Sequence, residues 1–237
     1  MDDVRVPTKI LSGNQILASL PAADLKRISA KLTPFELRFG EIIYEAGTPI
    51  DSVYFPDSGL VSLLATLNGS SVLEIGVVSR EGVVGLSAFL GTMKSRNRAL
   101  VQGEGHARSM KTTDFLEECQ STPKLAETLR HYTQTLIAQI SQSAICYRFH
   151  KIDARLARWL LVTADCMRAD EFRLTQEFLS FMLGVRREAI TNAAHRMQGQ
   201  EVINYSRGKI QILNRNALES AACVCYSIIK EELLNVG

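Results

Sequence analysis

Short runs of alternating apolar and polar residues fill the chain between residues 35 and 110, a pattern typical of β-strands. Turn-forming residues separate the runs, and Asn68-Gly69 is the clearest hairpin signal among them. Many short strands at near-regular spacing predict a sandwich or barrel. Before them, the apolar positions of Asn14–Lys31 predict short helices broken at Leu20-Pro21. The predicted strands centre on Phe35–Phe39, Ile42–Tyr44, Val53–Phe55, Val61–Leu63, Val72–Val77 and Leu100-Val101.

A helical period begins after Pro123, a residue type favoured in the first turn of helices. One long helix is predicted from Lys124 to Lys151, with a hinge over 149–153. Its apolar positions step by three and four residues, which is the spacing of a seam that packs against another helix. A second copy of the chain fits this seam, and so does the chain's own β-domain. The seam residues are Leu125, Leu129, Tyr132, Leu136, Ile140, Ala144 and Tyr147.

Helical spacing continues over Ala154–Met167 and again after Thr175, which is the predicted N-cap of a short helix that Gly184 ends. The helix after Gly184 has an apolar face that predicts burial. Two short strands, over 202–205 and 210–213, flank a turn at 206–209 and predict a hairpin. A last amphipathic helix is predicted over Asn216–Leu234. The buried face after Gly184 consists of Ile190, Ala193, Ala194 and Met197.

The opposite face of that helix carries side chains able to read DNA bases. Arginine can bond guanine, glutamate can accept from cytosine, and asparagine can bond adenine. A helix pair followed by a hairpin with cations at its tip is a winged helix-turn-helix, whose wing contacts phosphates. The alternative is an ordinary helical hairpin with a solvated polar face. The residues predicted to contact double-stranded DNA are Thr175, Arg186, Arg187, Glu188, Thr191, Asn192, Arg207 and Lys209.

The 237 residues allow two modest domains, and the net charge of +2 neither demands nor excludes nucleic acid. Cations outnumber acidic residues between Lys151 and Arg215, which suits a phosphate-facing surface. No apolar run approaches the ~20 residues of a membrane span, and the start Met1-Asp2-Asp3 is acidic, so a soluble cytoplasmic protein without membrane contact is expected. No nucleophile–base pair or P-loop is present, so no catalytic residues and no enzyme are predicted.

The odd number of cysteines and their wide spacing predict free thiols in a reducing compartment. Cys223-Val224-Cys225 is the only close pair, and no histidine or second pair lies near it in the sequence. We therefore predict structural packing for this pair and no metal site. The isolated histidines predict no haem ligand. The cysteines are Cys119, Cys146, Cys166, Cys223 and Cys225, and the histidines are His106, His131, His150 and His195.

Residues 174–213 resemble the DNA-binding domain of the Crp/Fnr family of bacterial transcription regulators. The resemblance rests on Leu-Thr-Gln-Glu at 174–177, on Gly184, on Arg187-Glu188 and on Arg-Gly-Lys at 207–209. It places Arg187 and Glu188 at the family's base-reading pair. Asn192 stands where the family often has a base-contacting arginine, and Arg186 where it often has a helix-capping serine. It also implies a homodimer on a pseudo-palindromic operator, and makes RNA polymerase a candidate partner.

The stretch from Phe35 to Met110 resembles the β-roll of cyclic-nucleotide-binding domains, which forms the N-terminal half of this family, on the motifs at 39–47 and 53–61. In that fold a Gly-Glu pair binds the ribose and an Arg-Ser or Arg-Thr pair binds the cyclic phosphate. Here Gly85 is kept, Leu86 replaces the glutamate, and Asn97-Arg98 replaces the second pair one position out of register. A buried phosphate without its arginine would be an unpaired charge, so cyclic AMP is not expected. The predicted effector pocket comprises Gly85, Leu86, Arg96, Asn97 and Arg98, and its ligand is left open.

Oxygen-sensing relatives carry N-terminal cysteines for an iron–sulfur centre, whereas no cysteine precedes Cys119, so no cofactor is expected. The fold class predicted is α+β, with an N-terminal β-roll (jelly-roll-like) effector-type domain over 1–122. A dimerisation helix and hinge follow over 123–151, and a winged helix-turn-helix DNA-binding domain with a C-terminal helix over 152–237. The function predicted is a sequence-specific DNA-binding transcription regulator. The alternative is a cyclic-nucleotide-domain-like signalling or protein-interaction module without DNA binding, which gives no reason to place Arg187, Arg207 and Lys209 on one face.

Overall fold

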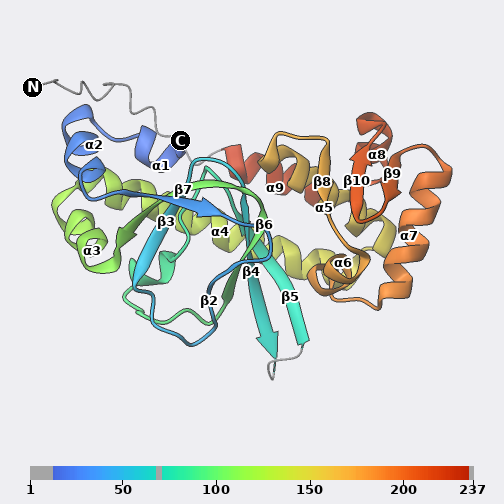
Figure 1. The fold of residues 1–237 in the computed structure, drawn as a ribbon, viewed down its shortest axis with the longest axis horizontal. Coiled ribbons are helices and arrows are strands. Elements are labelled where there is room, and N and C mark those ends of the chain that lie inside the picture. Colours follow the sequence, from blue (N-terminus) through green and yellow to red (C-terminus); the bar gives the residue numbers. More distant parts are fainter. Residues whose placement is uncertain (1–12, 68–70, 235–237) are drawn as a thin grey trace, which may run out of the picture.

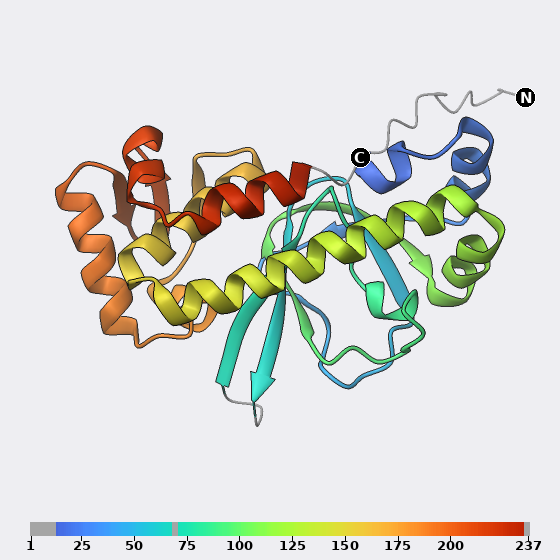
Figure 2. The ribbon, with the colours of Figure 1, turned by 180° about the vertical axis from the view of Figure 1, so that it is seen from behind.

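The computed structural model describes residues 13–67 and 71–234, which form a β-roll, a long helix and a winged helix domain (Figure 1). The fold is the α+β arrangement that the sequence predicts. Figure 2 shows the long helix α4 (Pro123–Phe149) running along the back of the β-roll and ending beside the winged helix domain. Within the described residues, no helix is both long and apolar enough to span a membrane.

Two antiparallel sheets make the β-roll. One has the order β1-β7-β3, formed by Thr33–Leu37, Gly105–Lys111 and Ser52–Pro56. The other has the order β2-β6-β4-β5, formed by Ile42–Tyr44, Arg98–Gly103, Leu60–Leu67 and Ser71–Val78. Side chains from both sheets, among them Phe55, Val61 and Ala99, form one buried core.

Every strand predicted from the apolar pattern forms, and among the described residues β7 is the one strand of the β-roll that the pattern misses. Only Ala107 and Met110 of β7 are buried, and they are three residues apart, so no alternation marks it. Strands β4 and β5 pair antiparallel up to Leu67 and Ser71, as a hairpin requires. The predicted turn at Asn68-Gly69 lies outside the described residues.

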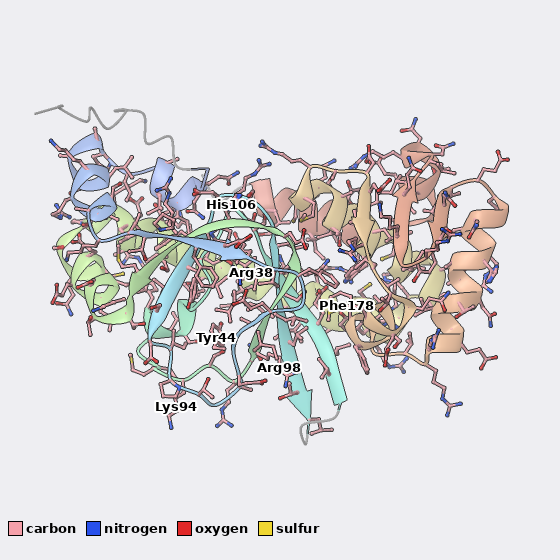
Figure 3. The ribbon with its side chains drawn as sticks, viewed as in Figure 1. Arg38, Tyr44, Lys94, Arg98, His106 and Phe178 are labelled. Carbon is pink, nitrogen blue, oxygen red and sulfur yellow. The ribbon has the colours of Figure 1, made fainter. Side chains whose placement is uncertain are left out.

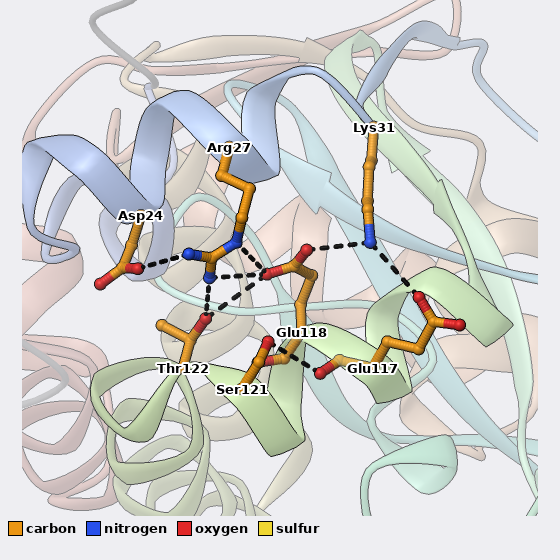
Figure 4. Close-up of polar contacts among 7 residues, drawn as sticks. All are labelled: Asp24, Arg27, Lys31, Glu117, Glu118, Ser121 and Thr122. Carbon is orange, nitrogen blue, oxygen red and sulfur yellow. Dashed lines mark hydrogen bonds and ion pairs between the residues drawn. The ribbon is translucent and has the colours of Figure 1, made fainter.

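Three short helices cover one end of the β-roll. The predicted break at Leu20-Pro21 is confirmed, because it separates α1 (Gln15–Ala18) from α2 (Ala22–Ser29). Helix α3 (Thr112–Ser121) was not predicted. The side chain of Glu118 of α3 is 3% exposed and forms ion pairs of 2.9 Å with Arg27 of α2 and with Lys31, which follows α2. Figure 4 shows these contacts. Burial alone would raise the pKa of Glu118, but hydrogen bonds from the two cations outweigh it and lower that pKa.

Helix α4 begins at Pro123 as predicted, but its predicted seam faces the chain's own β-roll. Leu125, Leu129 and Tyr132 are at most 1% exposed and belong to the β-roll core. Side chains already buried within one chain have no area left to bury against a second subunit. The assignment of these three residues to a dimer interface is therefore corrected.

The winged helix domain begins with α5 (Ile152–Met167), which is separated from the end of α4 by two residues, at the predicted hinge. It continues with β8 (Glu171–Arg173), α6 (Gln176–Leu183), α7 (Arg187–Gly199), β9 (Ile203–Ser206) and β10 (Lys209–Ile212). The predicted single helix over 216–234 is wrong, because the chain forms α8 (Arg215–Ala221) and α9 (Cys225–Leu234). Ala222 between them has an extended backbone, with φ −73° and ψ 153°, which ends the first helix.

Helix α5 is buried all round because it lies between the β-roll and the rest of the winged helix domain. Leu60 and Leu64 of β4 share a buried cluster with Leu160 of α5. Within this contact Trp159 Nε1 donates to Glu74 Oε1 at 2.8 Å. Burial raises the pKa of Glu74 to about 7, against smaller opposing effects of nearby hydrogen bonds and Arg158. The domain contact therefore contains a carboxyl group that titrates near neutral pH.

Candidate DNA-binding interface

Helix α6 has the two end signals that the sequence predicts. Thr175 Oγ1 accepts the backbone N–H of Phe178 at 3.0 Å, so Thr175 is an N-cap by geometry. Gly184 ends the helix with φ +60°, a conformation that favours glycine. A Cβ at Gly184 would lie 2.7 Å from Leu73 of β5, so this glycine also allows α6 to approach the β-roll. Phe178 completes this contact with a ring centroid 5.5 Å from that of Phe39, at the border between the domains (Figure 3).

Helix α7 has a buried face and an exposed face, as predicted. Ile190, Ala193, Ala194 and Met197 are at most 3% exposed and anchor the helix in the core. Arg187, Glu188, Asn192 and His195 are exposed, and Thr191 is half-buried. Arg186 is the N-cap residue, but its side chain makes no capping hydrogen bond.

The wing is a two-residue hairpin between β9 and β10. Ser206 pairs with Lys209, and the two residues of the turn, Arg207 and Gly208, have φ of 51° and 73°. Positive φ at both positions defines a type I′ turn, which matches the twist of the flanking strands. Strand β8, which the sequence analysis did not predict, pairs with β10 on its other side. The turn thus holds Arg207 at the tip of a three-stranded sheet.

A groove of about 460 Å³ joins the start of α6, the first turn of α7 and the wing. Arg187 and Arg207 lie on its two sides, and the free backbone N–H groups of the α6 start are near it, which suits a phosphate. Gln176 and Tyr205 also line the groove, although neither is among the predicted DNA contacts. The available signal for Gln176 was its position directly after the N-cap. The lining comprises Thr175, Gln176, Glu177, Arg187, Tyr205, Arg207 and Gly208.

Two predicted contact residues already have partners within the chain. Thr191 Oγ1 donates to Gln176 Oε1 at 2.8 Å and lies 3.1 Å from the carbonyl of Arg187, so it joins α7 to α6. Lys209 Nζ forms an exposed ion pair with Glu171 Oε1 at 3.2 Å. An exposed pair of this kind contributes little free energy and can exchange for a phosphate. Thr191 therefore has a positioning role in the free protein, whereas Lys209 stays available.

The predicted effector pocket is only partly assembled. A cavity of about 200 Å³ lies between α4 and the turn at Gly85, whose φ is +97° and which precedes the 3₁₀ helix η1 (Leu86–Ala88). Gly85, Leu86 and Asn97 line it together with apolar side chains of α4 such as Leu136 and Ile140. No charged residue is among those described that line it.

The two arginines predicted for this pocket lie elsewhere. Arg98, the first residue of β6, forms an ion pair of 2.7 Å from its Nε to Oε2 of Glu45, which directly follows β2. Figure 3 shows the position of Arg98. Arg96 is exposed and is not part of the lining of the cavity. The sequence pattern alone could not show this, because Glu45 and Arg98 are 53 residues apart.

A second cluster of candidate ligands lies where α4, α8 and α9 meet. The prediction of structural packing used only the sequence neighbourhood of Cys223 and Cys225, whereas the fold brings a histidine and a third cysteine to them from α4. The last turn of α4 brings Cys146 and His150 beside them, and the four potential ligand atoms all lie within 4.8 Å of one another. Residues so arranged can hold a metal ion.

Two family models match separate parts of the chain, one the β-roll and the other the winged helix domain. Residues 34–122 match the family model of the cyclic nucleotide-binding domain. Residues 154–221 match that of the Crp-like helix-turn-helix domain. No curated protein matches the sequence significantly.

Several solved structures have the same fold, and the aligned region spans nearly the whole of each solved chain. A Crp/Fnr family transcriptional regulator from Eubacterium rectale has a TM-score of 0.70 and 18% identity, over 88% of this chain and 98% of that one. FixK2 from Bradyrhizobium japonicum has a TM-score of 0.68 and 18% identity, over 81% and 98%. The c-di-GMP responsive global regulator CLP from Xanthomonas campestris has a TM-score of 0.67 and 14% identity, over 81% and 99%.

The two family models match in this order on either side of helix α4, and together they cover more than half of the chain. The winged helix geometry and the cations of the wing agree with this match. This chain belongs to the Crp/Fnr family of transcription regulators.

Proposed function

We propose that this regulator reads the bases of its operator with Arg187, Glu188 and Asn192. The phosphates of the operator are contacted by Arg186, Arg207 and Lys209. The observation that carries the proposal is the single exposed face of α7, which continues through the groove to the wing. Side chains in the first turns of a recognition helix reach base edges, whereas the wing lies over the backbone. Asn192, which can bond adenine through two atoms, gives this chain a different base preference from an arginine at the same place.

A footprint of the purified protein on the DNA upstream of its own coding region tests this function. We expect protection of a pseudo-palindromic site, with affinity falling steeply as salt is raised because phosphate contacts release counterions. Equal affinity for every duplex of the same length would contradict base reading. Absence of any DNA binding would favour the protein-interaction module instead.

We further propose that two copies pair through the exposed side of α4. Exposed positions follow one another at spacings of four and three residues along the helix, which is the seam of a two-stranded coiled coil. Ile137 is 53% exposed and Ile145 is 47% exposed, and the small side chains of Ser141 and Ala144 between them allow close approach. This seam lies on the other side of α4 from Leu125, Leu129 and Tyr132. Its positions are Arg130, Gln134, Ile137, Ser141, Ala144 and Arg148.

We also propose that cyclic AMP is not the effector. The cavity beside Gly85 is smaller than the about 300–1,000 Å³ of typical ligand pockets, and its described lining holds no cation for a phosphate. Arg98 is paired with Glu45, so recruiting it would break an ion pair. The lining suits a small apolar ligand or none.

A further inference from the structure

Four side chains that are distant in the sequence meet at the junction of α4 with the two C-terminal helices. Cys146 and His150 are four residues apart, so they share one face of the last turn of α4. Cys223 lies in the break between α8 and α9, and Cys225 is the first residue of α9. The break that interrupts the C-terminal helix therefore turns both of these cysteines toward α4.

The distances within this cluster have the size of a coordination tetrahedron. The sulfur atoms of Cys146 and Cys223 are 3.5 Å apart, and Cys225 Sγ is 3.4 Å from His150 Nδ1. A zinc ion with bonds of about 2.0–2.3 Å to nitrogen and sulfur holds its ligand atoms roughly 3.5–3.8 Å apart. Because no two of the four ligand atoms are more than 4.8 Å apart, the side chains need to move only slightly to surround one zinc ion. An iron–sulfur cluster would need its ligand atoms spread more widely than one ion does.

The cluster is enclosed and has the outer contacts of a structural metal centre. Cys146 and Cys225 are fully buried, Cys223 is 9% exposed and His150 is half-buried. Gln142 Nε2, one turn earlier on α4, donates to Cys225 Sγ at 3.0 Å. A hydrogen bond to a ligand atom orients it and tunes the metal, as outer contacts do in known sites.

Buried positive charge lies on the neighbouring face of α5. Arg158 is 4% exposed, and its Nε has no hydrogen-bond partner among the described residues. Arg158 also lies close enough to Cys146 and Cys223 to interact with both electrostatically. Three thiolates and one neutral imidazole around a divalent ion carry a net charge of about −1. A buried guanidinium compensates such a charge, whereas three neutral thiols would leave the arginine without a counter-charge on this side.

We propose that Cys146, His150, Cys223 and Cys225 form a tetrahedral zinc site that fastens α9 to the end of α4. A closed Cys₃His set with no open position is typical of structural zinc. His150 is also the C-cap of α4 and stands two residues before α5 begins. The site therefore holds the junction between the long helix and the winged helix domain. This inference rests on its own residues and is independent of the proposed DNA contacts.

The metal content of the full-length protein, purified with a thiol reductant and without chelator, tests the site. We expect about one zinc ion per chain by mass spectrometry of the elements. Replacing zinc with cobalt should give the intense sulfur-to-cobalt charge-transfer absorption of thiolate ligands. Cys225→Ser should lower metal affinity by more than the about 10–100-fold that losing an outer contact causes. Gln142→Leu should lower it within that range and keep the stoichiometry.

Cys119→Ser is the matched control, because Cys119 is a half-buried thiol that packs against the β-roll core. It should retain the metal and the cobalt spectrum. If the ligand variants fail to fold, the native protein still decides: hydrogen exchange should rise in α9 and in the last turn of α4 when a chelator removes the metal. A native protein that contains no zinc and gives no charge-transfer band with cobalt would overturn the site. So would a disulfide between Cys146 and Cys223 in the reduced preparation, since it would consume two ligands.

Discussion

Arg187 and Arg207 face the same groove, yet they should act on DNA in different ways. Arg187→Ala removes a bidentate contact to a base, so it should cost ~1–3 kcal/mol on the operator and far less on random duplex. Arg207→Ala should weaken both complexes alike and reduce the dependence of affinity on salt by about one phosphate contact. Fluorescence anisotropy titrations at several salt concentrations measure both effects.

Arg38→Ala is the matched control for these two variants, because Arg38 is an exposed arginine on the β-roll, bound to Glu36 (Figure 3). It should leave both affinities unchanged. If Arg187→Ala weakened operator and random DNA to the same extent, Arg187 would be a phosphate contact and base reading would rest on Asn192 and Glu188.

Glu74 should make the stability of the domain contact depend on pH. Its pKa is about 7 in the folded protein, against an ordinary value of 4.5. Because the folded value is raised, its contribution is complete below pH 4.5 and is lost as the pH rises through about 7. The difference between 4.5 and about 7, at 1.36 kcal/mol per pKa unit, should lower the free energy of unfolding by roughly 3 kcal/mol over this window.

Glu74→Gln should remove that dependence, because an amide can still accept from Trp159 and does not titrate. Chemical denaturation at pH 5 and pH 8 compares the two proteins. We expect similar stability at pH 5 and a more stable variant at pH 8. Parallel pH profiles of variant and native protein would show that Glu74 does not carry the effect.

Residues whose role depends on neighbours in the chain could be predicted, and residues whose role depends on distant partners could not. Thr175 and Gly184 act on backbone groups within a few positions, so residue type and spacing identified both. Arg98 and Cys146 have partners 53 and 77 residues away. No local pattern could show that Glu45 binds Arg98, or that Cys146 lies beside Cys223.

At the scale of whole elements, α4 has two faces with different tasks. Its period and its start at Pro123 predicted a long helix correctly, since both are local properties. The same period repeats on two sides, because Leu125, Leu129 and Tyr132 form one stripe and Ile137, Ser141 and Ala144 follow another. Only the position of the β-roll shows which stripe is already buried. Strand β7 and helix α3 were missed for the related reason that each buries few apolar side chains.

The exposed stripe gives a prediction about assembly. Ile145→Glu would place two like charges in a buried seam, which is costly, so the variant should be monomeric in analytical ultracentrifugation. Ile145 is next to Ala144 and four residues after Ser141, so it lies at the edge of this seam and is covered when two copies pair. The variant should also lose most operator affinity, because one chain contacts only one half-site. Leu67→Glu, at a residue 67% exposed at the end of β4, is the matched control and should leave the dimer intact. A dimeric Ile145→Glu variant would place the interface elsewhere.

In the whole molecule, α4 connects the effector cavity, the proposed dimer seam and the winged helix domain. Leu136, Ile137 and Ile140 line the cavity, and Ile137 also lies on the exposed seam. At the other end of the helix, Tyr147 donates a hydrogen bond to the carbonyl of Glu74 in the domain contact. A ligand in the cavity would therefore touch the element that sets both subunit pairing and domain position. A ligand can shift the position of α4 only if it binds two positions of this helix with different affinity.

Cyclic AMP should not be that ligand. Its phosphate carries a full negative charge, and the cavity of about 200 Å³ offers no cation among its described lining residues. Arg98 would have to leave Glu45, and Leu86 offers the ribose hydroxyl no acceptor. Isothermal titration calorimetry with millimolar cyclic AMP should detect no binding, and operator affinity should not change on its addition. Glu45→Gln, which releases Arg98, is the most sensitive variant for residual binding. Micromolar binding by the native protein that Arg98→Ala abolishes would mean that the ion pair opens and that the chain senses a cyclic nucleotide after all.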